Sequence, residues 1–128
     1  MLKALLAIAF VFLIFDYVFL MNVNRKMWYD QIKLIQGGAE PKFRVDVVAL
    51  CVYAIMIVAS YTFVVKQKYT PKETLGYGAL LGLAMYGVFD GTNYVIFKDY
   101  TLETGIIDTI YGMCVTAIAC YAGSLFNN

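Results

Sequence analysis

The sequence has no histidine and little charge. Of its 128 residues, 15% are charged and 62% are hydrophobic, whereas a soluble domain carries about 25% charged residues. The lack of histidine excludes imidazole ligands for haem or zinc, Ser-His and Cys-His nucleophile pairs, and an imidazole pH switch. The low charge excludes a soluble domain. We therefore expect an integral membrane protein in contact with the lipid bilayer.

Cysteine is also scarce. Cys51, Cys114 and Cys120 fall in apolar stretches without CxxC spacing, a pattern that favours free, buried thiols over disulfides or a metal cage. The net charge is +1 and no basic stripe alternates with aromatic residues, so we expect no nucleic acid partner. The chain carries no nucleophile motif and no cofactor signature. We expect no cofactor, and enzymatic activity is not favoured.

Four apolar runs are each long enough to cross a membrane, which takes roughly 20 residues. They cover residues 4–21, 47–65, 75–97 and 105–126. The first run is longer than the roughly 7 to 15 residues of a signal-peptide core, and no small-residue cleavage site follows it. We therefore expect an uncleaved first span and one all-α, multi-pass transmembrane domain: an antiparallel bundle of four helices.

The segment between the first two runs has a different pattern. In residues 23–36, Trp28, Ile32 and Ile35 recur at helical spacing, while charged residues occupy the other faces. This spacing predicts an amphipathic helix lying in the membrane interface, with Trp28 and Tyr29 at the level of the headgroups. Two following glycines end it.

The third run is rich in glycine, and its polar residues make its insertion marginal. Its glycines form two GxxxG spacings that allow close helix packing, and we favour packing within the chain over a homodimer face. Gly112, in the fourth run, lies four residues after an acid. The glycines expected to pack are Gly78, Gly82, Gly87, Gly91 and Gly112.

Three aspartates fall inside the apolar runs. At 1.5 Å of rise per residue, Asp16 lies roughly 18 Å into the first run, Asp90 roughly 22 Å into the third, and Asp108 about 5 Å into the fourth. The fourth run goes in the opposite direction to the other two, so all three carboxyl groups approach the same side of a core about 30 Å thick.

Helical spacing brings further polar groups to the same place. Tyr86, Asp90 and Asn93 are spaced i, i+4, i+7, which places them on one stripe of the third run. Four other tyrosines lie where runs end or loops begin and are expected in the aromatic belts, namely Tyr17, Tyr61, Tyr69 and Tyr100. The predicted polar pocket comprises Asp16, Tyr53, Tyr86, Asp90, Thr92, Asn93, Asp108 and Tyr111.

Three functions are compatible with such a pocket. Acids inside a membrane mark proton, ion or substrate sites by default, so the pocket could handle protons, a hard cation such as Na⁺, Mg²⁺ or Ca²⁺, or a small solute. Transport would then require an oligomer. Alternatively, the acids hold helices together in a structural or assembly component that contacts other membrane or capsid proteins. An intramembrane enzyme acting on a lipid-like substrate is less favoured.

Nearly the whole sequence resembles a known family. Residues 86–93 read YGVFDGTN and are followed by Asp108 and Gly112. This resembles the Y-x-x-Y-D-x-T-N and D-x-x-W-G signatures of small four-helix membrane proteins grouped as domain of unknown function twenty-one seventy-seven. Asp16, Tyr29 and Tyr53 look like its other recurrent positions.

The sequence departs from these signatures at the wall of the expected pocket. Phe89 stands where the family usually has Tyr, Gly91 replaces a bulky apolar residue, and Tyr111 replaces Trp. The resemblance implies the four-span fold and adds no reaction. Similar proteins occur in bacteria and in large DNA viruses, which implies a cell membrane or a viral inner membrane as the location.

Overall fold

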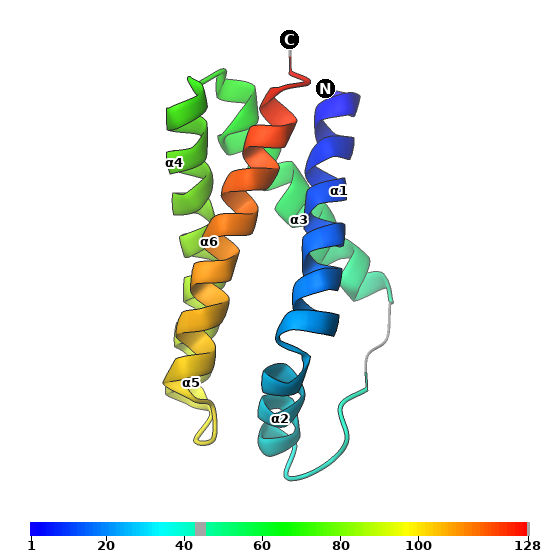
Figure 1. Ribbon diagram of the computed structural model, residues 1–128, viewed down its shortest axis with the longest axis vertical. Helices are drawn as coiled ribbons and strands as arrows, with labels where there is room; N and C mark the ends of the chain where they lie inside the picture. The colour runs from blue at the N-terminus through cyan, green and yellow to red at the C-terminus, as the bar shows by residue number, and fades with distance from the viewer. Residues whose placement is uncertain (43–45, 128) are drawn as a thin grey trace.

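The computed structural model describes residues 1–42 and 46–127, and all regular elements in these ranges are helical. The helices form an elongated bundle with the N- and C-termini at the same end (Figure 1). The elements are α1 (Leu2–Val18), the π-helical segment η1 (Phe19–Val23), α2 (Arg25–Ile35), α3 (Val47–Phe63), the 3₁₀ turn η2 (Val65–Gln67), α4 (Pro71–Gly82), the π-helical segment η3 (Leu83–Gly87), α5 (Val88–Ile96) and α6 (Leu102–Ser124).

Three helical runs in the described part of the chain are long and apolar enough to cross a membrane. They are Leu2–Val23, Val47–Gln67 and Leu102–Ser124, which correspond to the first, second and fourth apolar runs. The continuous helical run over residues 71–96 is not one of the three. It contains five glycines and Asp90, the features that make its insertion marginal in the sequence.

Helices α4 and α6 begin a few residues before the third and fourth apolar runs, because polar residues cap their N-termini. At the start of α4, the Thr70 hydroxyl accepts a hydrogen bond from the Glu73 backbone amide, and the Glu73 carboxylate accepts one from the Thr70 amide. At α6, the Thr101 hydroxyl accepts a hydrogen bond from the Thr104 amide. Such caps satisfy amide groups that have no partner within the helix.

Glycine lets α4 and α6 pack backbone to backbone. A Cβ at Gly82 would lie 2.3 Å from the carbonyl oxygen of Gly112, and one at Gly78 would lie 2.8 Å from the Cα of Ala117. A Cβ at Gly112 would in turn lie 2.1 Å from the ring of Tyr86. No side chain fits at these positions without moving a helix or the tyrosine.

The second glycine pair of the third run is less confined. A Cβ at Gly87 would lie 3.2 Å from the side chain of Leu83, which is a flexible neighbour. Gly91 is exposed, and no atom lies within 4 Å of the place a Cβ would take. Close packing of the 71–96 run therefore depends on its first glycine pair.

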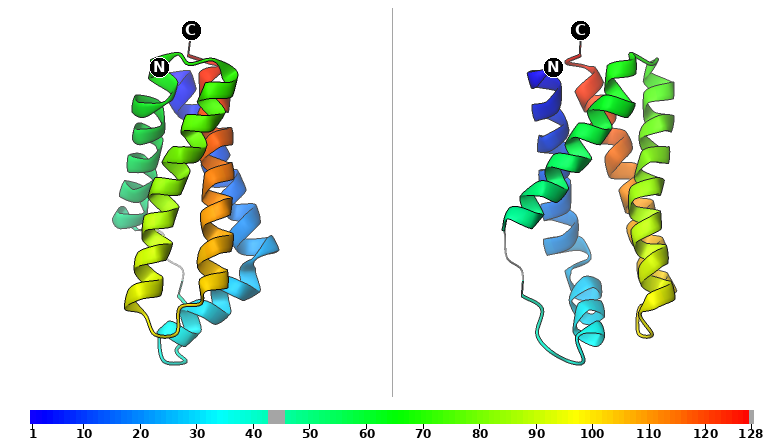
Figure 2. Two further views of the ribbon diagram at one scale, coloured as in Figure 1. Left: turned by 90° about the vertical axis from the view of Figure 1, so that its left-hand side faces the viewer. Right: turned by 180° about the vertical axis from the view of Figure 1, so that it is seen from behind.

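The apolar core lies between α1 and α6. Ile8 and Phe12 of α1 are fully buried and belong to one cluster with Val115 and Ala119 of α6. Helix α3 crosses the bundle obliquely (Figure 2), and only 11% of its apolar stretch is buried, against 44% for α6. Most of α3 is therefore available to contact lipid.

The cysteines are free thiols, as the sequence predicts. Cys120 is buried in the cluster between α1 and α6. The expectation that all three are buried is wrong for Cys51 and Cys114, which are exposed because they lie on outward faces of α3 and α6.

Candidate functional site

Asp16 joins three helices. Its carboxylate, near the end of α1, accepts hydrogen bonds from the hydroxyl of Tyr53 on α3 at 2.6 Å and from that of Tyr111 on α6 at 2.7 Å. The Tyr111 ring also stacks on Phe19, with the ring centroids 3.7 Å apart. Asp16 is 8% exposed, so this contact lies inside the bundle.

Asp90 and Asp108 form a buried pair. Asp90 on α5 accepts hydrogen bonds from Tyr100 at 2.5 Å and from Thr109 at 3.0 Å. Its carboxyl group is also close enough to that of Asp108 on α6 for the two to interact electrostatically. Asp90 is 2% exposed and Asp108 is 5% exposed. A hydrogen bond between two carboxyl groups requires a proton on one of them.

Tyr86 lies between this pair and Asp16. Asp16, Asp90 and Asp108 are all close enough to interact electrostatically with the Tyr86 side chain. The ring of Tyr86 covers Gly112 and meets the ring of Tyr111 edge to face, with the centroids 6.3 Å apart. The absence of a side chain at Gly112 thus allows a tyrosine to lie among the three acids.

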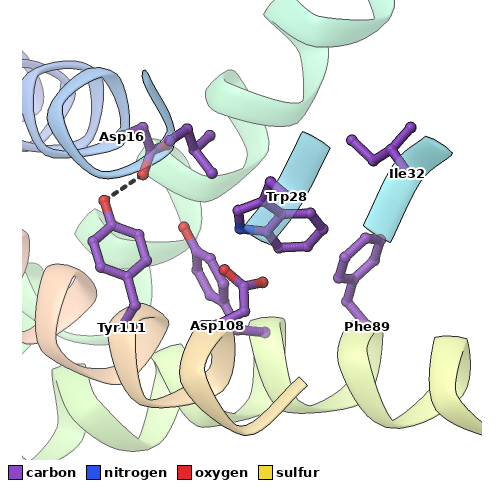
Figure 3. Close-up of a pocket in the computed structure, with 8 residues that line it drawn as sticks. Asp16, Trp28, Ile32, Phe89, Asp108 and Tyr111 are labelled. Carbon is purple, nitrogen blue, oxygen red and sulfur yellow. Dashed lines mark hydrogen bonds between the residues drawn. The ribbon is translucent and has the colours of Figure 1, made fainter. Parts of the chain in front are cut away.

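A cavity of about 200 Å³ opens beside these groups, between α1, α2, α5 and α6 (Figure 3). Two acids face it, and most of the remaining wall is aromatic. Asp90 faces a second cavity, of about 290 Å³, between α5 and α6. One acid of the pair therefore lines each cavity. The first cavity is lined by Asp16, Leu20, Trp28, Ile32, Tyr86, Phe89, Asp108 and Tyr111.

Helix α2 forms one wall of the first cavity. The Gln31 side chain is 3% exposed; its amide nitrogen donates to the Asp99 carbonyl at 2.7 Å, and its oxygen accepts from the Thr101 amide at 2.9 Å. These hydrogen bonds hold α2 against the loop between α5 and α6. The Trp28 side chain lies on the face of α2 that lines this cavity (Figure 3), and its position at the headgroup level stays a prediction.

The structure places two predicted site residues at the margin. Thr92 is exposed. Asn93 is half-buried and interacts with the hydroxyl of Tyr100. Neither residue lines the cavity that Asp16 and Asp108 face. In the ranges that the structure describes, no group of three acidic or cysteine side chains could hold a metal ion.

Three residues that form hydrogen bonds at or beside this site were not predicted from the sequence. Tyr100, expected in an aromatic belt, is 3% exposed and donates to Asp90. Burial and this hydrogen bond raise the pKa of Tyr100. Thr109 also donates to Asp90, and Gln31 fixes α2. One signal for Gln31 was available, because it falls on the apolar stripe between Trp28 and Ile35.

Comparison with known families gives one match. A family model described as "Predicted membrane protein (DUF2177)" matches residues 1–125. No curated protein and no solved structure matches the chain. The suggestion of a viral membrane or of capsid partners stays a prediction.

Proposed function

Because the chain belongs to the family of predicted membrane proteins DUF2177, we propose that it is a multi-pass membrane protein whose buried aspartates hold and exchange a proton. In this proposal α1, α3, the 71–96 run and α6 cross the bilayer in alternating directions, and α2 lies in the interface. The described structure supports a membrane location through three helices that are long and apolar enough to span a bilayer.

The packing of the third run supports its place as a fourth crossing. Its glycines Gly78 and Gly82 rest against α6, and its acid, Asp90, is buried against the same helix. Helix α6 thus shields Asp90 and the glycine backbone from lipid, where exposed polar groups would cost the most free energy. Helix α2 is amphipathic, with Gln31 buried and Arg25, Lys26 and Asp30 exposed, as in a helix that lies on a bilayer.

The observation that carries the proton proposal is the contact between Asp90 and Asp108. Two carboxyl groups at this distance inside a low-dielectric core do not both ionise. The two ion pairs found in the described chain, Lys26 with Asp30 and Lys33 with Glu40, lie outside the site. A shared proton therefore balances part of the charge of the pair. Asp108 lines one cavity and Asp90 lines the other, so each acid of the pair has a cavity beside it.

Infrared spectroscopy of the purified full-length protein tests the shared proton. Only a protonated carboxyl group gives the C=O stretch that ionised carboxylates lack. At neutral pH we expect one buried band of this kind, and either Asp90→Asn or Asp108→Asn should remove it. Asp99→Asn is the matched control, because Asp99 is exposed in the neighbouring loop, and it should leave the band unchanged. A wild-type spectrum without the band, or a band that survives both variants, would overturn the proposal.

A structural role is the second candidate, and the geometry of Asp16 favours it. This carboxylate ties α1 to α3 and α6 through two tyrosine hydroxyls. Helix α3 has little other burial in the bundle. Under this alternative the acids fix helix positions, and no proton is exchanged.

A further inference from the structure

The first cavity combines acids with aromatic walls. Asp16 and Asp108 supply negative charge, and Trp28, Tyr86, Phe89 and Tyr111 supply ring surfaces. Among the residues that the structure describes, no lysine or arginine lines the cavity. The electron-rich faces of aromatic rings attract cations, and rings with a nearby acid recognise substituted ammonium groups. The cavity is therefore suited to a cation that has apolar substituents.

The same walls are poorly suited to a metal ion. Hard cations such as Na⁺, Mg²⁺ and Ca²⁺ take several oxygen ligands at short distances. In the described chain no three acidic side chains converge in that way. Both oxygens of Asp16 already accept hydrogen bonds from tyrosines. An organic cation needs only one nearby carboxylate and the ring faces.

The Trp28 indole indicates that a ligand of this cavity should also carry a hydrogen-bond acceptor. Its indole Nε1 is buried and has no hydrogen-bond partner among the described residues. Figure 3 shows the indole on the cavity side of α2, next to Asp108. A buried N–H without an acceptor costs free energy. A ligand that fills the cavity and brings an acceptor oxygen would satisfy it.

We propose that this cavity binds a small organic ammonium ion that carries an acceptor oxygen, of the amino-alcohol type, either free or as a lipid headgroup. The ammonium group lies near Asp108 and over the aromatic rings, and the oxygen accepts from Trp28. This inference rests on the proposed function, because the cation and the shared proton compete for the same carboxyl charge. No covalent step is involved.

Choline is the probe, and its neutral isostere 3,3-dimethylbutan-1-ol is the control ligand, since the two differ in charge and not in shape. Full-length protein in maltoside detergent is titrated by calorimetry and by emission of Trp28, the only tryptophan in the sequence. We expect saturable binding of choline, tighter at higher pH, and none of the isostere. A short-chain phosphatidylcholine, titrated below its micelle concentration, tests whether the headgroup is the better ligand.

Variants assign the binding to the cavity. Asp108→Asn should weaken choline binding by about tenfold or more, because it removes the buried charge that pairs with the ammonium group. Asp99→Asn should leave the affinity unchanged. Phe89→Leu keeps all the charges and removes one ring from an exposed side chain, so it tests the cavity even where Asp108→Asn fails to fold. It should weaken binding by about threefold to tenfold.

The outcomes separate the two proposals. Equal binding of choline and the isostere, or affinities that neither Asp108→Asn nor Phe89→Leu changes, would overturn the ammonium site. If the shared-proton band is present and neither choline nor the phosphatidylcholine binds, the ammonium site is wrong and the proton proposal stands. If the band is absent as well, both are wrong.

Discussion

Replacing Gly82 with alanine should destabilise the protein by about 1–3 kcal/mol, the usual cost of overpacking a close contact. The added methyl group would lie 2.3 Å from the carbonyl oxygen of Gly112 and 2.8 Å from the Cα of Met113. Both are backbone atoms, so the clash is relieved only by moving α4 away from α6. We expect a lower midpoint of thermal unfolding in detergent, followed by circular dichroism.

Gly76→Ala is the matched control for this substitution. Gly76 lies in the same helix, and no atom lies within 4 Å of the place its Cβ would take. Alanine is the better helix former by roughly 1 kcal/mol, so this variant should be as stable as the wild type or slightly more stable. Equal losses for Gly76→Ala and Gly82→Ala would contradict the backbone contact between α4 and α6.

Replacing Asp16 with leucine should also cost stability, by roughly 1–3 kcal/mol for each hydroxyl left buried without a partner. The substitution removes the acceptor of both Tyr53 and Tyr111. Hydrogen bonds inside membranes average nearer 0.6 kcal/mol, so the loss should fall toward the lower end of this range. Thermal unfolding measures it.

The triple variant Asp16→Leu, Tyr53→Phe, Tyr111→Phe distinguishes this cause from simple loss of packing. Removing both hydroxyls together with the acid leaves no unpaired polar group, so most of the lost stability should return. Tyr94→Phe, on an exposed tyrosine of α5, is the control and should change little. If the triple variant is less stable than Asp16→Leu, the hydrogen bonds are not what makes Asp16 important to the fold.

Hydropathy predicts best the helices whose apolar side chains are stable against lipid without a neighbouring helix. Helices α1, α3 and α6 belong to runs that are long and apolar enough to span a membrane despite single acids, so lipid and protein surroundings both favour them. The 71–96 run differs, because its glycines and Asp90 become favourable only when α6 covers them. Its stability depends on tertiary contacts, which a sum over single residues does not contain.

The site likewise has features that the sequence predicts and features that depend on tertiary contacts. Depth along the helices predicts that Asp16, Asp90 and Asp108 approach one side of the membrane, and in the structure all three interact with Tyr86. The partners of Asp90 could not be predicted, since Tyr100 reaches it from a loop whose course depends on α2 and Gln31. The cavity-lining position of Trp28 could not be predicted for a similar reason: spacing identifies the apolar face of α2, but the hydrogen bonds of Gln31 decide which helices that face meets.

Carbon-13 NMR of the aspartate carboxyl groups is the most direct test that Asp90 and Asp108 act as one unit. The sequence has six aspartates, and single Asp→Asn variants assign their signals. If a proton is shared, the Asp90 and Asp108 signals should move together, each showing the same two steps as the pH changes. A single, independent step at both Asp90 and Asp108 would contradict the shared proton and leave the three acids as separate structural contacts.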